Sequence, residues 1–201
     1  MTRFAVFASG RGSNLEALFD DLADHPAARI ALVASDRGDA PALDRARRRG
    51  VPVAVLDPAD PAGTIALLEA HRIDWVVLAG YLKRIPAPVV ERYRGRILNV
   101  HPALLPRFGG PGMYGARVHA AVIEAGETLS GASVHLVDEE YDRGPVVAQR
   151  TVPVAPGDTP ETLAARVLEV EHRLLPAVVR AAAEGRVHAE GDRAWVEGEL
   201  E

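Results

Sequence analysis

The chain has 201 residues, of which 48% are apolar and 25% charged, and its formal charge is −5. A chain of this length can bury a substantial core as one domain. It contains no cysteine, which excludes disulfides, thiol nucleophiles and cysteine-ligated metal centres. No apolar run approaches the roughly 20 residues that span a bilayer. The mild acidity and an aromatic content of 5% argue against a nucleic-acid partner.

The amino-terminal segment, Met1 to Phe4, leads straight into a strand-like stretch. It lacks the charged lead and long apolar segment of a signal peptide. We therefore expect a cytoplasmic protein.

Apolar runs alternate with helix-patterned stretches through the first half of the chain. The runs are nearly continuous rather than alternating, which is typical of strands buried on both faces. Such repeated strand–helix units indicate an α/β fold with a mostly parallel twisted sheet and helices on both faces. We predict strands at Phe4–Ala8, Ile30–Ala34, Val51–Leu56, Trp75–Ala79 and Ile97–Val100, and helices at Leu15–Ala23, Pro41–Arg49, Gly63–His71 and Pro86–Tyr93.

The second half has a different pattern. Ser130–Val137 and Val146–Val154 alternate between apolar and polar residues, and the segment 142–145 between them is typical of a turn, so we predict an antiparallel extension of the sheet. A long helix follows, capped by Asp158 or Thr159, with Pro160 in its first turn. Pro176 is expected to kink or interrupt this helix. The tail, Val187 to Val196, is compatible with a small hairpin.

A glycine-rich loop, Gly10-Arg11-Gly12-Ser13-Asn14, connects the first strand to the first helix. Glycines allow a tight turn, and the start of a helix presents N–H groups that favour an anion. A dinucleotide site would place Asp36 on the ribose, but Leu15 stands where that fold needs its third glycine. A Walker loop would need a lysine. A phosphate monoester held by residues 12–14 fits best, and a plain serine-capped turn is the alternative.

Asn99 and His101 lie two residues apart at the end of the fifth predicted strand, with Pro102 and Pro106 following. Their spacing places both side chains on one face, and ligands bind outside the carboxyl ends of parallel strands. An amide donor beside an imidazole suits stabilisation of an oxyanion and movement of a proton. The alternative is a packed, hydrogen-bonded histidine.

The acidic segment Asp138 to Asp142 is either a solvated turn or part of a site. Its spacing does not match that of a calcium loop, and we predict no metal. A carboxylate placed against His101 would favour the imidazolium and raise the pKa of that histidine, which would give a proton donor near neutral pH.

Three other features have simpler interpretations. The basic run Arg45 to Arg49 is predicted to be a solvated helix face rather than a nucleic-acid patch. His135 is expected to be a hydrogen-bonded histidine of the core or one that supports the site. His119 ends a glycine-rich stretch, 107–119, from which it could contact a ligand.

Taken together, the motifs of this chain resemble those of the phosphoribosylglycinamide formyltransferase family, the folate-dependent enzymes of purine synthesis. The resemblance covers essentially the whole chain in order. It is carried by Gly-Arg-Gly-Ser-Asn (10–14), Val-Leu-Ala-Gly-Tyr-Leu (77–82), Asn-Val-His-Pro-Ala-Leu-Leu-Pro (99–106), Gly-Ala-Ser-Val-His (131–135), Asp-Arg-Gly-Pro (142–145) and Glu171-His172.

The resemblance implies a Rossmann-like formyltransferase fold over residues 1–201, with a phosphate-binding half, 1–100, and a folate-binding and catalytic half, 101–201. It implies transfer of a formyl group from 10-formyltetrahydrofolate to the amine of the small-molecule substrate 5'-phosphoribosylglycinamide, by a monomer or homodimer. The implied catalytic residues are Asn99, His101 and Asp142. Gly12, Ser13, Asn14 and Glu171 would bind the ribonucleotide, and Leu82, Lys83, Arg84, Ile85, Asn99, Asp138, Glu139, Glu140, Tyr141 and Asp142 would bind folate.

Two other classes of function remain open from the sequence. One is a sister enzyme, either a formyl-tetrahydrofolate hydrolase or the catalytic domain of a methionyl-tRNA formyltransferase. The first normally carries a domain ahead of this fold, whereas the first strand here is expected at residue 3. The second carries a carboxyl-terminal barrel and more positive charge. The other class is a nucleotide-binding module without chemistry, in which replacing His101 would leave activity unchanged.

Overall fold

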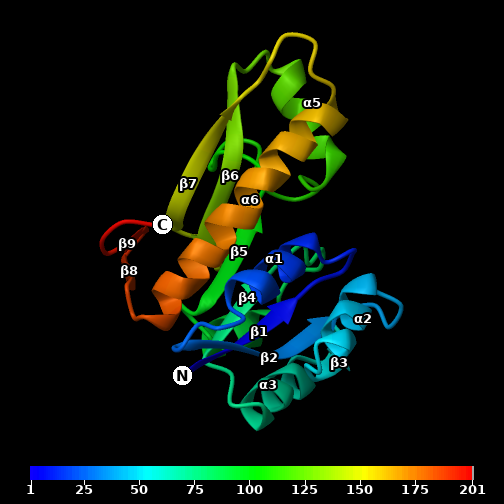
Figure 1. Cartoon of the computed structure of the whole chain (residues 1–201), viewed down its shortest axis with the longest axis vertical. Coiled ribbons are helices and arrows are strands. Elements are labelled where there is room, and N and C mark those ends of the chain that lie inside the picture. Colours follow the sequence, from blue (N-terminus) through cyan, green and yellow to red (C-terminus); the bar gives the residue numbers. More distant parts are fainter. Residues whose placement is uncertain (201) are drawn as a thin grey trace. The chain divides into compact units, whose positions relative to one another are not determined.

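The computed structural model describes residues 1–200 (Figure 1). These residues form two compact units, of which the first is Met1–Asn99 and the second begins at Val100. The strand order in the main sheet is β3-β2-β1-β4-β5-β6-β7, and the boundary between the units falls within β5. No helix of residues 1–200 combines the length and the apolar character that crossing a membrane requires.

The first unit consists of repeated strand–helix units, as predicted. All its strand pairs are parallel: β1 pairs with β2 and β4, β2 with β3, and β4 with β5. The continuous apolar runs are buried; Phe4 to Ala8, for example, are at most 1% exposed. The elements are β1 (Thr2–Phe7), α1 (Ser13–Asp21), β2 (Ala28–Ser35), α2 (Pro41–Arg48), β3 (Val53–Val55), α3 (Pro61–Ala70), β4 (Trp75–Leu78), α4 (Ala87–Arg92) and β5 (Ile97–His101).

In the second unit, a long helix, α6, packs against the strands β6 and β7 and against α5 (Figure 1). The β6–β7 pair is antiparallel, which confirms the predicted extension of the sheet, and β8 and β9 form the predicted terminal hairpin. The elements are α5 (Ala116–Glu124), β6 (Leu129–Leu136), β7 (Val146–Pro153), α6 (Pro160–Ala183), β8 (Val187–Glu190) and β9 (Arg193–Val196).

Helix α6 departs from the prediction at one point. It is capped by Thr159 in a capping box with Thr162, as expected, but it runs through Pro176 without a break. Proline removes one N–H from the helical ladder. Packing offsets that loss, because Pro176 and its neighbours Leu174 and Leu175 are all buried. The expectation of an interruption was therefore wrong.

Helix α5 was not predicted. It follows a glycine-rich stretch and has only nine residues, with Gly115 as its N-cap. Its buried face consists of Val118, His119 and Val122. Because one of these three buried residues is a polar histidine, the apolar pattern in the sequence is too short to predict a helix.

The turn between β6 and β7 depends on a glycine. A Cβ atom on Gly144 would lie 1.9 Å from the carbonyl oxygen of Leu136 and 3.3 Å from the backbone nitrogen of Asp138. Both neighbours are backbone atoms, which cannot rotate away. The glycine of the Asp-Arg-Gly-Pro segment is thus required by close backbone approach, and it fixes the path of the chain just after Asp142.

We therefore expect Gly144→Ala to lower the free energy of unfolding by roughly 2–3 kcal/mol, the cost of forcing an extra methyl group into a packed site. Denaturant unfolding followed by circular dichroism measures this. The matched control is Gly38→Ala, whose Cβ would meet only Val55 at an ordinary 3.7 Å. Equal stabilities of the two variants would contradict the role given to Gly144.

Candidate active site

The glycine-rich loop ends in a residue with a left-handed backbone. Gly12 has φ of 74° and ψ of 36° and is the N-cap of α1, which begins at Ser13. A Cβ on Gly12 would lie 2.9 Å from the Cβ of Ala42, so glycine is needed for both conformation and space. Because the cap residue is a glycine, the serine cap of the alternative interpretation is wrong. The first turn of α1 instead presents its backbone N–H groups without a capping side chain, which suits an anion.

Ser9 connects the ends of three strands of the first unit. Its hydroxyl donates to Oδ1 of Asp36 after β2 at 2.6 Å and accepts from the backbone N–H of Leu82 after β4 at 3.0 Å. Its own N–H donates to the carbonyl of Gly80 at 3.0 Å. Asp36 is thus already bound to Ser9, which weakens its assignment as a ribose-binding acid of a dinucleotide site. The sequence analysis did not single out Ser9.

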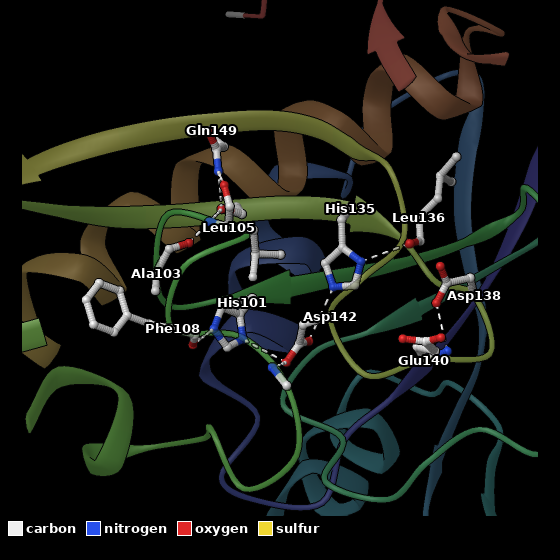
Figure 2. A network of polar contacts seen from close by, with 12 residues as sticks. His101, Ala103, Leu105, Phe108, His135, Leu136, Asp138, Glu140, Asp142 and Gln149 are labelled. Atoms are coloured by element: carbon white, nitrogen blue, oxygen red, sulfur yellow. Dashed lines mark hydrogen bonds and ion pairs between the residues drawn. The ribbon is translucent and has the colours of Figure 1, made fainter. Parts of the chain in front are cut away.

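His101, at the end of β5, is buried and held at both ring nitrogens (Figure 2). Its Nε2 lies 2.8 Å from the carbonyl oxygen of Phe108, and its Nδ1 lies 3.6 Å from Oδ2 of Asp142. A carbonyl oxygen only accepts hydrogen bonds, so Nε2 carries the proton of the neutral ring. The lone pair of Nδ1 then faces the carboxylate, and a proton added there would form an ion pair with Asp142.

Asp142 lies between two histidines, as Figure 2 shows. Its Oδ1 is 3.5 Å from Nε2 of His135, while Nδ1 of His135 lies 2.8 Å from the carbonyl oxygen of Leu136. The backbone N–H of Gly110 donates to Oδ2 of Asp142 at 2.9 Å. Asp142 has a left-handed φ of 54°, an uncommon conformation for a residue other than glycine and one that clusters at functional sites.

The loop that follows His101 is fixed by a second polar network. The hydroxyl of Ser133 on β6 donates to the carbonyl of Ala103 at 2.6 Å and accepts from the N–H of Leu105 at 3.0 Å. The side-chain amide of Gln149 on β7 donates to Ser133 at 2.8 Å and to the carbonyl of Leu105 at 2.9 Å. These bonds anchor residues 103–105 to the β6–β7 pair.

The electrostatics of the pair differ from expectation in one respect. Burial lowers the pKa of His101, and Asp142 and the hydrogen bond to Phe108 raise it by less, so the net shift is downward. The expected effect of the carboxylate is present, but a net rise in the pKa of His101 was wrong, because the cost of charging a buried imidazole is larger. Burial also raises the pKa of Asp142, but the contact with His135, the nearby His101 and the Gly110 N–H outweigh it and lower that pKa.

The structure brings His101 and Asp142 together, as the sequence analysis expected, and adds His135 to them. Asn99 is half-buried on β5, two residues before His101. In the other predicted segments, Asn14 and Glu171 are both 8% exposed. Leu82 is 52% exposed and Ile85 6% in the first unit, and Tyr141 is 39% exposed in the second. Lys83, Arg84, Glu139 and Glu140 are exposed.

His119 is a further buried polar group near His101. It is 4% exposed on α5, and its Nδ1 has no hydrogen-bond partner within residues 1–200. Burial lowers the pKa of His119, and the proximity of His101 lowers it further. Residues 1–200 hold no cluster of three or more acidic or histidine side chains arranged to bind a metal ion.

Comparison with known proteins assigns the chain to a family. The formyl transferase family matches residues 2–179. The chain is 43% identical over 194 residues to the chloroplastic phosphoribosylglycinamide formyltransferase of Arabidopsis thaliana, covering 92% of this chain but 66% of that protein, just under two thirds of its length. It is 37% identical over 209 residues to the phosphoribosylglycinamide formyltransferase of Haemophilus influenzae, covering 98% of this chain and 95% of the relative.

A solved structure has the same fold. The glycinamide ribonucleotide transformylase 1 of Symbiobacterium toebii superposes with a TM-score of 0.90 at 40% identity, covering 98% of this chain and 94% of that one. The predicted mostly parallel sheet with an antiparallel extension is therefore confirmed.

The contacts of His101 predict how it titrates. Because burial outweighs the carboxylate, NMR titration of the ring proton should give a pKa below that of an ordinary histidine. In Asp142→Asn the pKa should fall further, since the charge that favours the imidazolium is gone. An unchanged or higher pKa in the variant would show that Asp142 does not act on the ring.

Proposed function

The chain belongs to the formyl transferase family, and we propose that it transfers the formyl group of 10-formyltetrahydrofolate to the amine of 5'-phosphoribosylglycinamide. The products are formylglycinamide ribonucleotide and tetrahydrofolate, in purine biosynthesis. The observation that carries the proposal is the buried pair of His101 and Asp142. Asn99 lies two residues before His101 on β5. Relatives with that activity in their names support the substrate.

The proposed phosphate site is the glycine loop with the start of α1. Gly12, Ser13 and Asn14 supply backbone N–H groups and short polar side chains there, and the helix dipole favours a dianion. Glu171, on α6, is the proposed partner of the ribose hydroxyls, because a carboxylate accepts two such bonds.

The proposed chemistry uses Asn99 and His101 as oxyanion donors. The substrate amine attacks the formyl carbon, a C–N bond forms and the carbonyl electron pair moves to oxygen. The Asn99 amide and the Nε2–H of His101 donate to that oxygen, the second in place of its present bond to Phe108. Both donors lie on one face of β5, and His101 exchanges its bond to Phe108 for the bond to the oxyanion.

The proton balance gives Asp142 its role. The attacking nitrogen must lose a proton, and N10 of the folate must gain one before its bond to the formyl carbon breaks. Nδ1 of His101 can hold that proton, because the resulting imidazolium faces Asp142. The low pKa of the free ring favours release of the proton to the leaving nitrogen through water. This scheme forms no covalent bond to the protein and involves no metal.

The residues proposed to bind folate lie in two segments, one in each unit. Leu82 to Ile85 supply an exposed leucine beside a buried isoleucine, and Asp138 to Asp142 supply polar backbone groups with Tyr141. In this proposal, residues 1–201 act as one formyltransferase domain, with a phosphate-binding half, 1–100, and a folate-binding and catalytic half, 101–201.

We further propose a cytoplasmic enzyme that acts on small molecules as a monomer or homodimer, without a nucleic-acid partner. The basic run on α2 supports the last point. Arg45 and Arg49 pair with Glu16, and Arg47 pairs with Asp44, so this surface is largely neutralised.

The direct test supplies both substrates and follows release of tetrahydrofolate together with formation of the formylated ribonucleotide. The proposal expects product only when the ribonucleotide is present. Equal release of tetrahydrofolate without it would indicate a hydrolase, and no turnover with tight ribonucleotide binding would indicate a binding module.

Asn99→Ala is expected to slow turnover by roughly 10²–10³-fold, since it removes one oxyanion donor. Thermal unfolding should change little, because Asn99 is only half-buried. Steady-state kinetics with both substrates measures the loss. A decrease smaller than about threefold would remove Asn99 from the mechanism.

Ser13→Asp is expected to weaken binding of the ribonucleotide far more than that of folate, by roughly 10-fold or more, because it sets a carboxylate against the phosphate. Separate titrations with each substrate check this. Equal effects on the two would contradict the phosphate assignment.

A further inference from the structure

Residues of helix α2 donate hydrogen bonds to the backbone carbonyls of the glycine loop. The N–H of Ala42 donates to the carbonyl oxygen of Gly10 at 3.2 Å, and Nε of Arg45 donates to the carbonyl oxygen of Arg11 at 2.8 Å. Ala42 also packs so closely on Gly12 that no side chain fits there. The first two turns of α2 therefore bind the loop at three consecutive residues.

These two bonds determine where the neighbouring N–H groups point. A trans peptide is planar, and its C=O and N–H point in opposite directions. The carbonyl of Gly10 shares its peptide with the N–H of Arg11, and the carbonyl of Arg11 shares its peptide with the N–H of Gly12. Because α2 holds both carbonyls, both N–H groups point away from α2. Successive N–H groups beside a left-handed residue form a concavity that binds anions.

Arg45 also controls the charge next to the loop. Its Nη1 lies 2.9 Å from Oε2 of Glu16, which is in the first turn of α1. The hydrogen bond from Arg45 outweighs partial burial and, with Arg49, holds the pKa of Glu16 below its ordinary value. Glu16 is therefore charged at neutral pH. An unpaired carboxylate there would repel a phosphate at the same helix terminus.

We propose that Arg45 is a positioning residue of the phosphate site. It holds the Arg11–Gly12 peptide so that its N–H faces the bound phosphate, and its charge offsets that of Glu16. The inference rests on the proposed function for the identity of the anion. It replaces the expectation that the whole basic run is a solvated face: Arg45 acts on the loop, whereas Arg47 pairs with Asp44 on the exposed side.

The test is Arg45→Met, which keeps the length of the side chain and removes both of its interactions. Calorimetry without folate should show affinity for 5'-phosphoribosylglycinamide weakened by about 10-fold or more, the effect of losing a charge-assisted hydrogen bond. The KM for the ribonucleotide should rise in step, while kcat and the KM for 10-formyltetrahydrofolate stay within about twofold. Arg45→Lys keeps the charge but lacks the planar guanidinium, so its affinity for the ribonucleotide should lie between those of wild type and Arg45→Met.

Two comparisons separate this positioning of the Arg11–Gly12 peptide by Arg45, which we call the clamp, from simpler explanations. Arg47→Met removes a nearby arginine that makes no contact with the loop, and its affinity should match that of wild type. In the Glu16→Gln/Arg45→Met double variant the repulsion is gone but the clamp is still missing, so ribonucleotide binding should stay weak. Full recovery in the double variant would overturn the clamp, and so would Arg45→Met binding within twofold of wild type.

The phosphate dependence provides the readout that a general loss of structure would not give. The riboside that lacks the phosphate should inhibit wild type and Arg45→Met equally. If Arg45→Met weakens binding of the riboside as much as binding of the ribonucleotide, Arg45 does not act on the phosphate.

Exchange of the Ala42 amide hydrogen, which is bonded to the carbonyl oxygen of Gly10, separates this inference from the proposed function. Exchange should be faster in Arg45→Met than in wild type whatever the substrate is. Wild type that binds no ribonucleotide would contradict the proposed function, whereas unchanged exchange in the variant would contradict the clamp.

Discussion

The Asp142 carboxylate lies between two imidazoles, and the rest of the site depends on this arrangement. The outer nitrogen of His101 faces a backbone carbonyl, so its inner nitrogen faces the carboxylate as a lone pair when the ring is neutral, while Nε2 of His135 contacts the other carboxylate oxygen. A single proton added to His101 at Nδ1 therefore converts a repulsive contact into an ion pair. His101 can thus take up and release a proton while Nε2 keeps its hydrogen. A group that donates to an oxyanion and also carries a proton needs this division between its two nitrogens.

Backbone geometry, more than side-chain packing, holds these groups in place. Gly144, two residues after Asp142, allows close approach of the backbone at Leu136 and Asp138, and the Ser133 hydroxyl fixes the loop after His101 through two backbone groups. The same principle applies in the first unit, where Gly12 and Arg45 set the direction of peptide groups in the glycine loop. In both units a glycine and a polar side chain position the main chain, and neighbouring side chains carry out the proposed chemistry.

Much of this could be predicted from the sequence, because the signals are local. Continuous apolar runs predicted the buried parallel strands. The ends of these runs predicted that the glycine loop and His101 lie at the carboxyl ends of strands. Other features depend on tertiary contacts. The pKa of His101 reflects burial against one carboxylate, and the sequence shows only the carboxylate. Pro176 is tolerated because its neighbours are buried, and the role of Arg45 depends on a loop 34 residues earlier in the chain.

The most direct test of this account is the tautomeric state of His101, measured by ¹⁵N NMR of the imidazole ring in the free protein at neutral pH. The account predicts hydrogen on Nε2 of His101, where it donates to the backbone carbonyl of Phe108. A neutral His101 that instead carries its hydrogen on Nδ1 and donates to Asp142 would contradict it. In that case Nε2 would have no hydrogen to give to the oxygen of the formyl group.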